Sequence, residues 1–129
     1  MEIGALTKSE PLQAWLPYDE DTEILIQYVP RDVLQGIYKK AMQNVYKPEL
    51  ADRLLSERAV KDWRKSENGK GFTLDGQPYP FSAENAAFLM TRWNEFSRFV
   101  NDACINLDLL VRQEKATVAK NSSNTSGQN

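Results

Sequence analysis

Apolar and polar residues alternate near the N-terminus in a way that predicts a strand. The run from Thr22 to Val29 is rich in β-branched and aromatic residues, which favour extended backbone. Ile24, Ile26 and Tyr28 then share one face of that strand. The polar stretch 17–21 is able to turn the chain, so that residues 13–16 pair with the strand. We therefore expect an N-terminal β-hairpin, preceded by a loose arm over residues 1–13.

Two helices are predicted next, and a proline opens each of them. Pro30 ends the strand and suits the first turn of a helix, after which apolar residues recur at helical spacing over residues 31–45. Pro48 opens the second helix in the same way. Its apolar positions continue at spacings of three and four as far as Trp63. We therefore expect residues 60–64 to be the end of this second helix.

The centre of the chain combines a glycine-containing break with a tight turn. Residues 66–71 interrupt the helical pattern, and Asp75-Gly76 is a strong signal for a two-residue hairpin. Pro78 and Pro80 lack the N–H group that a sheet ladder needs. The sequence therefore predicts an edge ribbon or an irregular hairpin at this point.

A long helix is predicted after the hairpin. Ser82 is a plausible N-cap, and apolar residues then recur at spacings of three and four from Ala83 to about Lys115. Such a helix has roughly 33 residues and a length of ~50 Å. Residues 116–129 are polar and are expected to form a disordered tail.

These patterns together predict a mainly α fold. We expect a single small helical domain over residues 1–115 with a long C-terminal helix. A short N-terminal strand or hairpin and a central Asp-Gly β-hairpin complete the expected architecture.

Charge and hydropathy disfavour nucleic-acid and membrane partners. The chain has 129 residues and a formal net charge of −2, whereas nucleic-acid binders normally carry a basic excess. It contains no run of about 18 apolar residues, so no transmembrane segment is expected. The N-terminus also lacks a basic segment followed by an apolar one, so no signal peptide is expected.

Histidine is absent and Cys104 is the only cysteine. An intrachain disulfide, a usual zinc site and a Ser-His-Asp or Cys-His arrangement are therefore all excluded. Cys104 falls on the apolar stripe of the predicted long helix, where a buried, unreactive thiol is expected. We accordingly expect no enzyme activity, no metal and no cofactor.

Four polar features invite a chemical interpretation that their surroundings do not support. Gly69-Lys70-Gly71 lacks the earlier glycine and the Ser or Thr of a phosphate-binding loop. The acidic cluster 19–23 lacks the spacing of a calcium loop and reads as a solvated turn. Asp75 belongs to its turn, and Glu84 suits the positive end of a helix dipole.

Aromatic residues gather between residues 63 and 93. They are Trp63, Phe72, Tyr79, Phe81, Phe88 and Trp93. One interpretation places them in the core between the hairpin and the helices. The other exposes part of the set as a docking surface, since Trp and Tyr are favoured at interface hot spots. As partner-binding residues we select Trp63, Phe72, Tyr79 and Phe81, with the core as the alternative for each.

The same central region resembles a known protein family. Val60-Lys61-Asp62-Trp63 ends in a tryptophan, and Asp75-Gly76-Gln77-Pro78-Tyr79-Pro80-Phe81-Ser82-Ala83-Glu84-Asn85 follows it. This order is similar to the tail assembly chaperones of long-tailed bacteriophages and prophages. Their pattern is V-x-x-W, a Gly-containing loop and D-G-x-P-x-P-[FC]-[ST]-x-E-N. The resemblance covers roughly residues 14–112. Family members often have two helices where one long helix is predicted, so the resemblance implies a break at 92–94 as the alternative. Family members often have Arg-Gly after the tryptophan, where this chain has Arg64-Lys65.

The resemblance implies a small, mostly helical, non-enzymatic protein of the bacterial host cytoplasm. Such proteins bind the long tape-measure protein, keep it soluble while tail-tube subunits assemble, and are absent from the virion. Many are also made as a longer product by ribosomal frameshifting, whose extension recruits the tail-tube protein. In this chain Lys120-Asn121 is the candidate position for such a frameshift. The alternative function is that of a structural tail-completion or neck protein of the virion.

Overall fold

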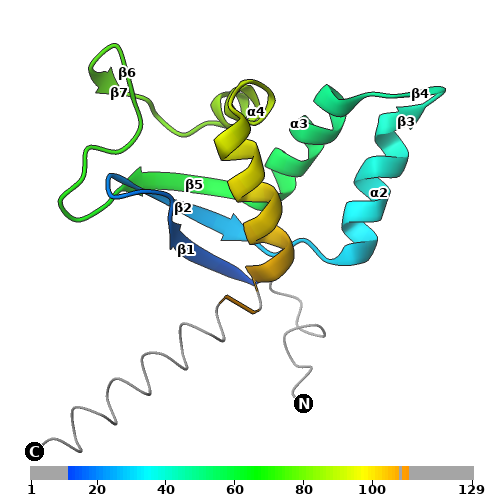
Figure 1. Cartoon of the computed structure of the whole chain (residues 1–129), viewed down its shortest axis with the longest axis horizontal. Coiled ribbons are helices and arrows are strands. Elements are labelled where there is room, and N and C mark those ends of the chain that lie inside the picture. The colour runs from blue at the N-terminus through cyan, green and yellow to red at the C-terminus, as the bar shows by residue number, and fades with distance from the viewer. Residues whose placement is uncertain (1–11, 108, 111–129) are drawn as a thin grey trace, which may run out of the picture.

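The computed structural model of the chain describes residues 12–107 and 109–110, in which helices lie over one face of a small antiparallel sheet (Figure 1). The elements in chain order are β1 (Gln13–Pro17), β2 (Thr22–Gln27), α2 (Arg31–Ala41), β3 (Met42–Gln43), β4 (Val45–Tyr46), α3 (Pro48–Ala59), β5 (Val60–Lys65), β6 (Thr73–Leu74), β7 (Gln77–Pro78) and α4 (Ala83–Arg92). A further helix follows over residues 94–107, and we call it the last described helix.

The N-terminal hairpin is confirmed. Strand β1 pairs antiparallel with β2, with Trp15 opposite Leu25, and β2 is the central strand of the order β1-β2-β5. Along β2 the side chains alternate between full burial at Thr22, Ile24 and Ile26 and partial exposure at their neighbours. This alternation places one face of the sheet against the helices, as expected for an amphipathic strand.

Residues 60–65 form a strand, so the prediction of a helix end over 60–64 is wrong. Helix α3 ends at Ala59 and the chain continues directly into β5, which pairs antiparallel with β2. A register shift next to Leu25 inserts one extra residue into β5, and Val60 and Trp63 both face the core. Without this bulge two residues three apart would point to opposite faces. The bulged strand therefore imitates the i, i+3 spacing of a helix.

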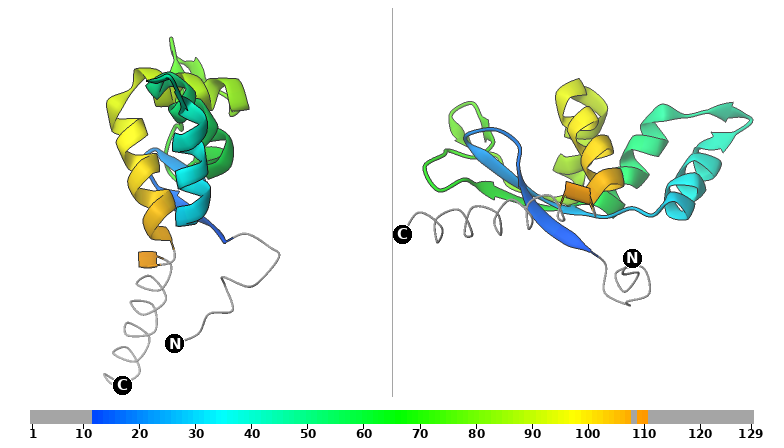
Figure 2. Two further views of the ribbon diagram at one scale, coloured as in Figure 1. Left: turned by 90° about the vertical axis from the view of Figure 1, so that its right-hand side faces the viewer. Right: turned by 60° about the horizontal axis from the view of Figure 1, so that its bottom comes forward.

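Helix α2 is shorter than the expected 31–45. It ends at Ala41, and β3 and β4 form a tight antiparallel hairpin in which Asn44 adopts a positive φ of 68°. Asparagine tolerates this left-handed conformation better than most residues. Helices α2 and α3 and this hairpin form an arm. Its β3–β4 end lies at the opposite end of the molecule from β6 and β7 (Figures 1 and 2).

The expected long C-terminal helix is interrupted at Trp93, where the alternative break occurs. Trp93 has extended backbone angles (φ −121°, ψ 102°) and ends α4. Its N–H donates to the Leu89 carbonyl at 2.8 Å, and its own carbonyl accepts the N–H of Ser97 at 3.0 Å. Trp93 therefore closes one helix and opens the next. The change of direction lets α4 pack on α3 and lets the last described helix cover the sheet.

The fold class is accordingly mixed α and β, and the expectation of a mainly α fold with a long C-terminal helix is wrong. The sequence signals for helices were correct at the starts of α2, α3 and α4. The error came from a strand and a hairpin that follow helices without a break in the apolar pattern, at residues 60–65 and 42–46.

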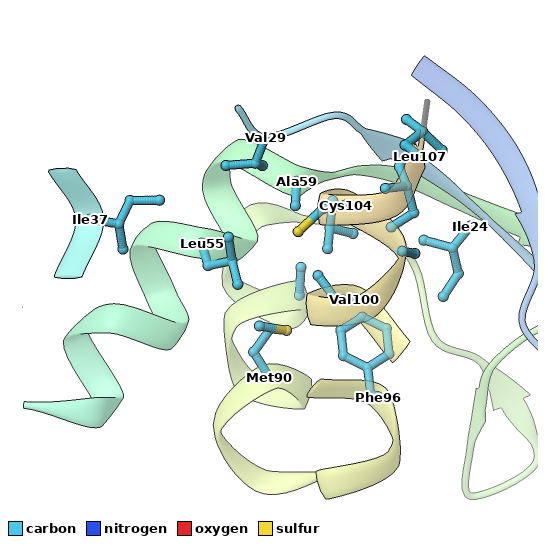
Figure 3. Close-up of a cluster of buried hydrophobic side chains, with 14 of the residues drawn as sticks. Ile24, Val29, Ile37, Leu55, Ala59, Met90, Phe96, Val100, Cys104 and Leu107 are labelled. Carbon is cyan, nitrogen blue, oxygen red and sulfur yellow. The ribbon is translucent and has the colours of Figure 1, made fainter. Parts of the chain in front are cut away.

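The core joins the sheet to α2, α3, α4 and the last described helix (Figure 3). Phe96, Val100 and Leu107 are fully buried beside Ile24, and the N–H of Val29 donates to the Cys104 carbonyl at 3.1 Å. Cys104 is buried as expected. Within the described ranges no helix combines the length and hydropathy needed to cross a membrane. The predicted tail over 116–129 lies outside the described residues. The same is true of residues 1–11 of the loose N-terminal segment predicted over 1–13.

Candidate functional site: an apolar cleft with an acidic rim

The four residues selected for partner binding meet around the indole of Trp63. Its ring lies 5.2 Å from that of Phe72 and 5.1 Å from that of Phe81, both edge-on, and 6.0 Å from the stacked ring of Tyr79. The indole Nε1–H donates to the Tyr79 carbonyl at 2.9 Å. Trp63 is only 7% exposed. The structure thus brings the four together, with Trp63 as the buried residue on which the other three pack.

The central hairpin that carries Tyr79 is held by its turn and by its base. Asp75 and Gly76 both have positive φ, 51° and 80°, which is the pattern of a type I′ turn and confirms the Asp-Gly prediction. The Tyr79 N–H donates to the Phe72 carbonyl at 2.8 Å and closes the hairpin. This bond fixes the positions of the Phe72 and Tyr79 rings relative to each other.

The start of α4 is fixed by two side chains. The predicted N-cap is confirmed, because the Ser82 hydroxyl accepts the Asn85 N–H at 2.9 Å. The Asn85 side chain in turn donates to the Pro80 carbonyl at 2.8 Å. Each bond satisfies a backbone group that the helix or the proline segment leaves free. Helix α4 is thereby oriented against the hairpin.

A cleft of about 670 Å³ opens between the hairpin, α4 and the β1–β2 turn. Its apolar lining residues are Phe72, Leu74, Tyr79, Phe88, Leu89 and Trp93, and its other lining residues are Asp19, Asp21, Thr22, Gly71, Thr73, Glu84 and Asn85. This volume is within the range of pockets that bind ligands or anchor side chains. Of the four predicted residues, Phe72 and Tyr79 line the cleft, while Trp63 and Phe81 are not among the lining residues.

The rim of the cleft is acidic. Asp19, Asp21 and Glu84 are among its lining residues, which include no lysine or arginine. Over the residues that the structure describes, the only ion pair joins Arg64 to Glu23 at 2.7 Å, away from the cleft. The three carboxylates therefore have no ion-pair partner in that part of the chain. A cationic group entering the cleft would meet negative charge that is not already neutralised.

The β1–β2 turn and the 66–71 loop form one wall, clamped at Asp21. The Asp21 carbonyl accepts the N–H groups of Ser66 and Gly71, both at 2.9 Å, and its carboxylate accepts the Lys70 N–H at 3.2 Å. A Cβ on Gly69 would collide with Ser66 and with the Asp21 backbone. Gly69 therefore allows close packing, and Gly71 supplies a positive φ of 73°. The N–H groups of Ser66, Lys70 and Gly71 are directed at Asp21 rather than at a phosphate.

Tyr18 packs beneath this wall. Its ring makes edge-on contacts with Phe72, Trp93 and Phe99 at centroid distances of 5.1 to 5.5 Å. Its hydroxyl is buried and has no hydrogen-bond partner among the described residues, and the same holds for the Thr22 hydroxyl. Burial, with the carboxylates of Glu95 and Asp19, raises the pKa of Tyr18 to about 12. Tyr18 therefore contributes a neutral, rigid aromatic support.

Sequence reasoning missed part of this site. Phe88 and Trp93 belonged to the aromatic set but were not assigned to partner binding, and Leu74 and Leu89 were not considered for it. Phe88 is 54% exposed. The sequence signal for this exposure is its position off the apolar stripe of α4. The carboxylates each had a sufficient local explanation in a turn or a helix dipole. Their position around one cleft depends on tertiary structure.

The cleft presents six apolar side chains together with three carboxylates. No set of three His, Cys, Asp or Glu side chains in the described ranges is arranged to hold a metal ion. A second hollow of about 560 Å³ at the start of α3 is lined by the charged residues Lys47, Glu49 and Arg53 and by Tyr46, Pro48 and Leu50. Comparisons with protein-family models, with curated proteins and with solved structures found no match to the chain.

Proposed function

We propose that this chain is a tail assembly chaperone of a long-tailed phage or prophage. It binds the tape-measure protein in the cytoplasm of the bacterial host, keeps it soluble while the tail tube assembles, and does not remain in the virion. One observation carries the proposal. The Asp75–Asn85 segment, on which the sequence resemblance rests, belongs to the hairpin and helix start that build the apolar cleft.

The cleft suits a client that presents apolar side chains from an extended or helical segment. Burying two or three such side chains gains roughly 4–8 kcal/mol, from which the cost of association is subtracted. Each contact is therefore weak and reversible. A long client that offers many such segments binds many copies, and growing tube subunits can displace them without any chemical step. The proposed role needs neither a cofactor nor a metal.

The test is co-expression with overlapping fragments of the tape-measure protein encoded beside this chain. We expect the chain to raise the soluble fraction of at least one fragment and to co-purify with it. Phe88→Glu, which places a charge inside the cleft, should abolish both effects. Ile105→Glu is the matched control, because Ile105 is also exposed (43%) but does not line the cleft. Failure of the unmodified chain to bind any fragment would contradict the proposal.

Tyr79→Ala is a second cleft variant. It should weaken client binding, but it also removes the ring that stacks on Trp63. Thermal unfolding of the variant must therefore be measured alongside binding. A large fall in melting temperature would show that Tyr79 serves mainly the core.

Two further measurements examine the remaining parts of the proposal. Mass spectrometry of purified particles should not detect the chain, whereas a tail-completion or neck protein would be present. The proposed contact with the tail-tube protein requires a frameshifted longer product. A gene without a run of repeated bases around the codons of Lys120-Asn121 would remove that part of the proposal.

A further inference from the structure

A second apolar surface lies at the free end of the arm. We call it the arm tip and define it as Tyr38, Met42, Val45 and Tyr46. These side chains are 44%, 58%, 70% and 37% exposed, respectively. Tyr38 lies on α2, and the other three lie on the β3–β4 hairpin, with Met42 and Tyr46 on one of its faces and Val45 on the other. Exposed apolar groups gathered at one end of a molecule mark an interaction site more often than isolated ones do. The proposed function does not use this surface.

The arm tip is rigid rather than a loose loop. Strands β3 and β4 pair Met42 with Tyr46, and the Lys47 N–H donates to the Ala41 carbonyl at 3.0 Å. The rings of Tyr38 and Tyr46 meet edge-on at 6.4 Å. A preorganised surface of this kind loses little conformational entropy when it docks.

Charge at the arm tip is complementary to charge at the cleft. Residues 33–48 contain Lys39, Lys40 and Lys47 and no acidic residue. All three lysines are exposed, and none belongs to the single ion pair found in the described part of the chain. The cleft offers three carboxylates and no basic residue among its lining side chains. Glu49, Asp52 and Arg53 also lie beside Tyr46, and together with the three lysines they leave the arm tip net positive. The guanidinium of Arg92 lies over the ring of Phe88, and together with the three carboxylates it leaves the cleft net negative.

We propose that the arm tip of one copy of this chain docks in the cleft of a second copy. The two surfaces lie at opposite ends of the molecule, so a copy cannot fill its own cleft (Figures 1 and 2). The contact joins two different surfaces and is therefore heterologous. It covers the exposed apolar side chains at both ends while no client is bound. The self-association does not rest on the proposed function, but it makes the client and the neighbouring copy competitors for one cleft.

The test uses sedimentation velocity of the whole chain from about 1 to about 200 µM, since a contact made by a few side chains is expected to be weak. The weight-average mass should rise with concentration. It should fall in about 1 M NaCl, where screening shortens the reach of charges to ~3 Å. Val45→Glu at the arm tip and Phe88→Glu in the cleft should each weaken association by at least about tenfold. Ile105→Glu, outside both surfaces, should leave it unchanged.

Mixing the two defective variants identifies the contact. Val45→Glu retains an intact cleft and Phe88→Glu retains an intact arm tip, so the mixture should associate although neither variant does so alone. Lys47→Glu and Glu84→Lys form a second pair in which only exposed charges are reversed, in case a first-pair variant fails to fold. Circular dichroism checks the fold of every variant.

Three results would overturn the inference. The first is that the unmodified chain remains monomeric over the whole concentration range. The second is that a complementary pair of folded variants remains monomeric when mixed. The third is that Ile105→Glu weakens association as much as Phe88→Glu does. A monomeric chain that still binds a tape-measure fragment through the cleft would overturn self-association and leave the proposed function standing. Self-association of a chain that binds no tape-measure fragment would overturn the proposed function and leave the self-association standing.

Discussion

Phe96→Ala is expected to be among the most damaging single substitutions in this fold. Phe96 is fully buried, and its ring lies 6.1 to 6.2 Å from the rings of Tyr18, Trp63, Phe72 and Trp93. Truncating a buried phenylalanine typically costs about 3–5 kcal/mol, and the loss of four aromatic contacts favours the upper part of that range. A domain of this size is stable by about 5–15 kcal/mol, so Phe96→Ala should remove about a third of that stability or more.

The measurement is urea unfolding followed by far-ultraviolet circular dichroism. With a slope of about 1.5 kcal/mol per molar urea, a loss of about 4 kcal/mol moves the midpoint down by about 2.7 M. Phe88→Ala is the matched control, because it deletes the same ring from a helix position that is 54% exposed. It should change the unfolding free energy by less than about 1 kcal/mol. Similar losses for the two variants would refute the assignment of Phe96 to the centre of the core.

Three further predictions concern single groups. Ser82→Ala removes the acceptor of the Asn85 N–H and should cost about 1 kcal/mol of unfolding free energy, whereas Ser82→Asp should retain most of it; equal losses would contradict the cap. Burial raises the pKa of Cys104 to about 11, so Ellman's reagent at pH 8 should modify the folded chain about a hundredfold more slowly than the urea-unfolded chain; comparable rates would contradict burial of the thiol. Tyrosine in an unfolded chain ionises near pH 10, and Tyr18 in the fold ionises near pH 12. The stability contributed by its neutral form is therefore complete below about pH 10 and is lost between about pH 10 and 12. Tyr18→Phe should flatten that decline in a series of unfolding free energies against pH, and an unchanged decline would contradict the assignment.

Local chemistry made several elements predictable from the sequence. Pro48 marks a helix start because its fixed φ suits the first turn, and Ser82 does so because its hydroxyl caps the helix. Pro30 precedes α2 as its N-cap residue, with extended backbone. Asp75-Gly76 predicts its turn because both residues tolerate a positive φ. Each of these signals depends only on neighbours in the chain.

The errors came from features that depend on distant neighbours. Val60 and Trp63 share a face only because β5 carries a bulge against β2, and a spacing of three then reads as a helix. Trp93 interrupts a helical pattern whose spacing continues unbroken, since its ring packs with Tyr18 from the far end of the chain. The cleft likewise combines residues 19–22 with residues 71–93. Periodicity describes one element at a time and contains no information on which elements meet.

The order of the strands in the sheet has a consequence for when the cleft can exist. Strands β1 and β2 are joined by a short turn and can pair as soon as both are synthesised. Strand β5 pairs with β2 across about 40 residues, which include two helices. The last wall of the cleft forms only after residues up to Trp93 have been synthesised. Closing a loop of that length precedes the contacts that stabilise it, which makes such pairings late steps in folding. A chain whose residues up to Trp93 have not all emerged from the ribosome therefore lacks the complete cleft, and it cannot yet bind an occupant there.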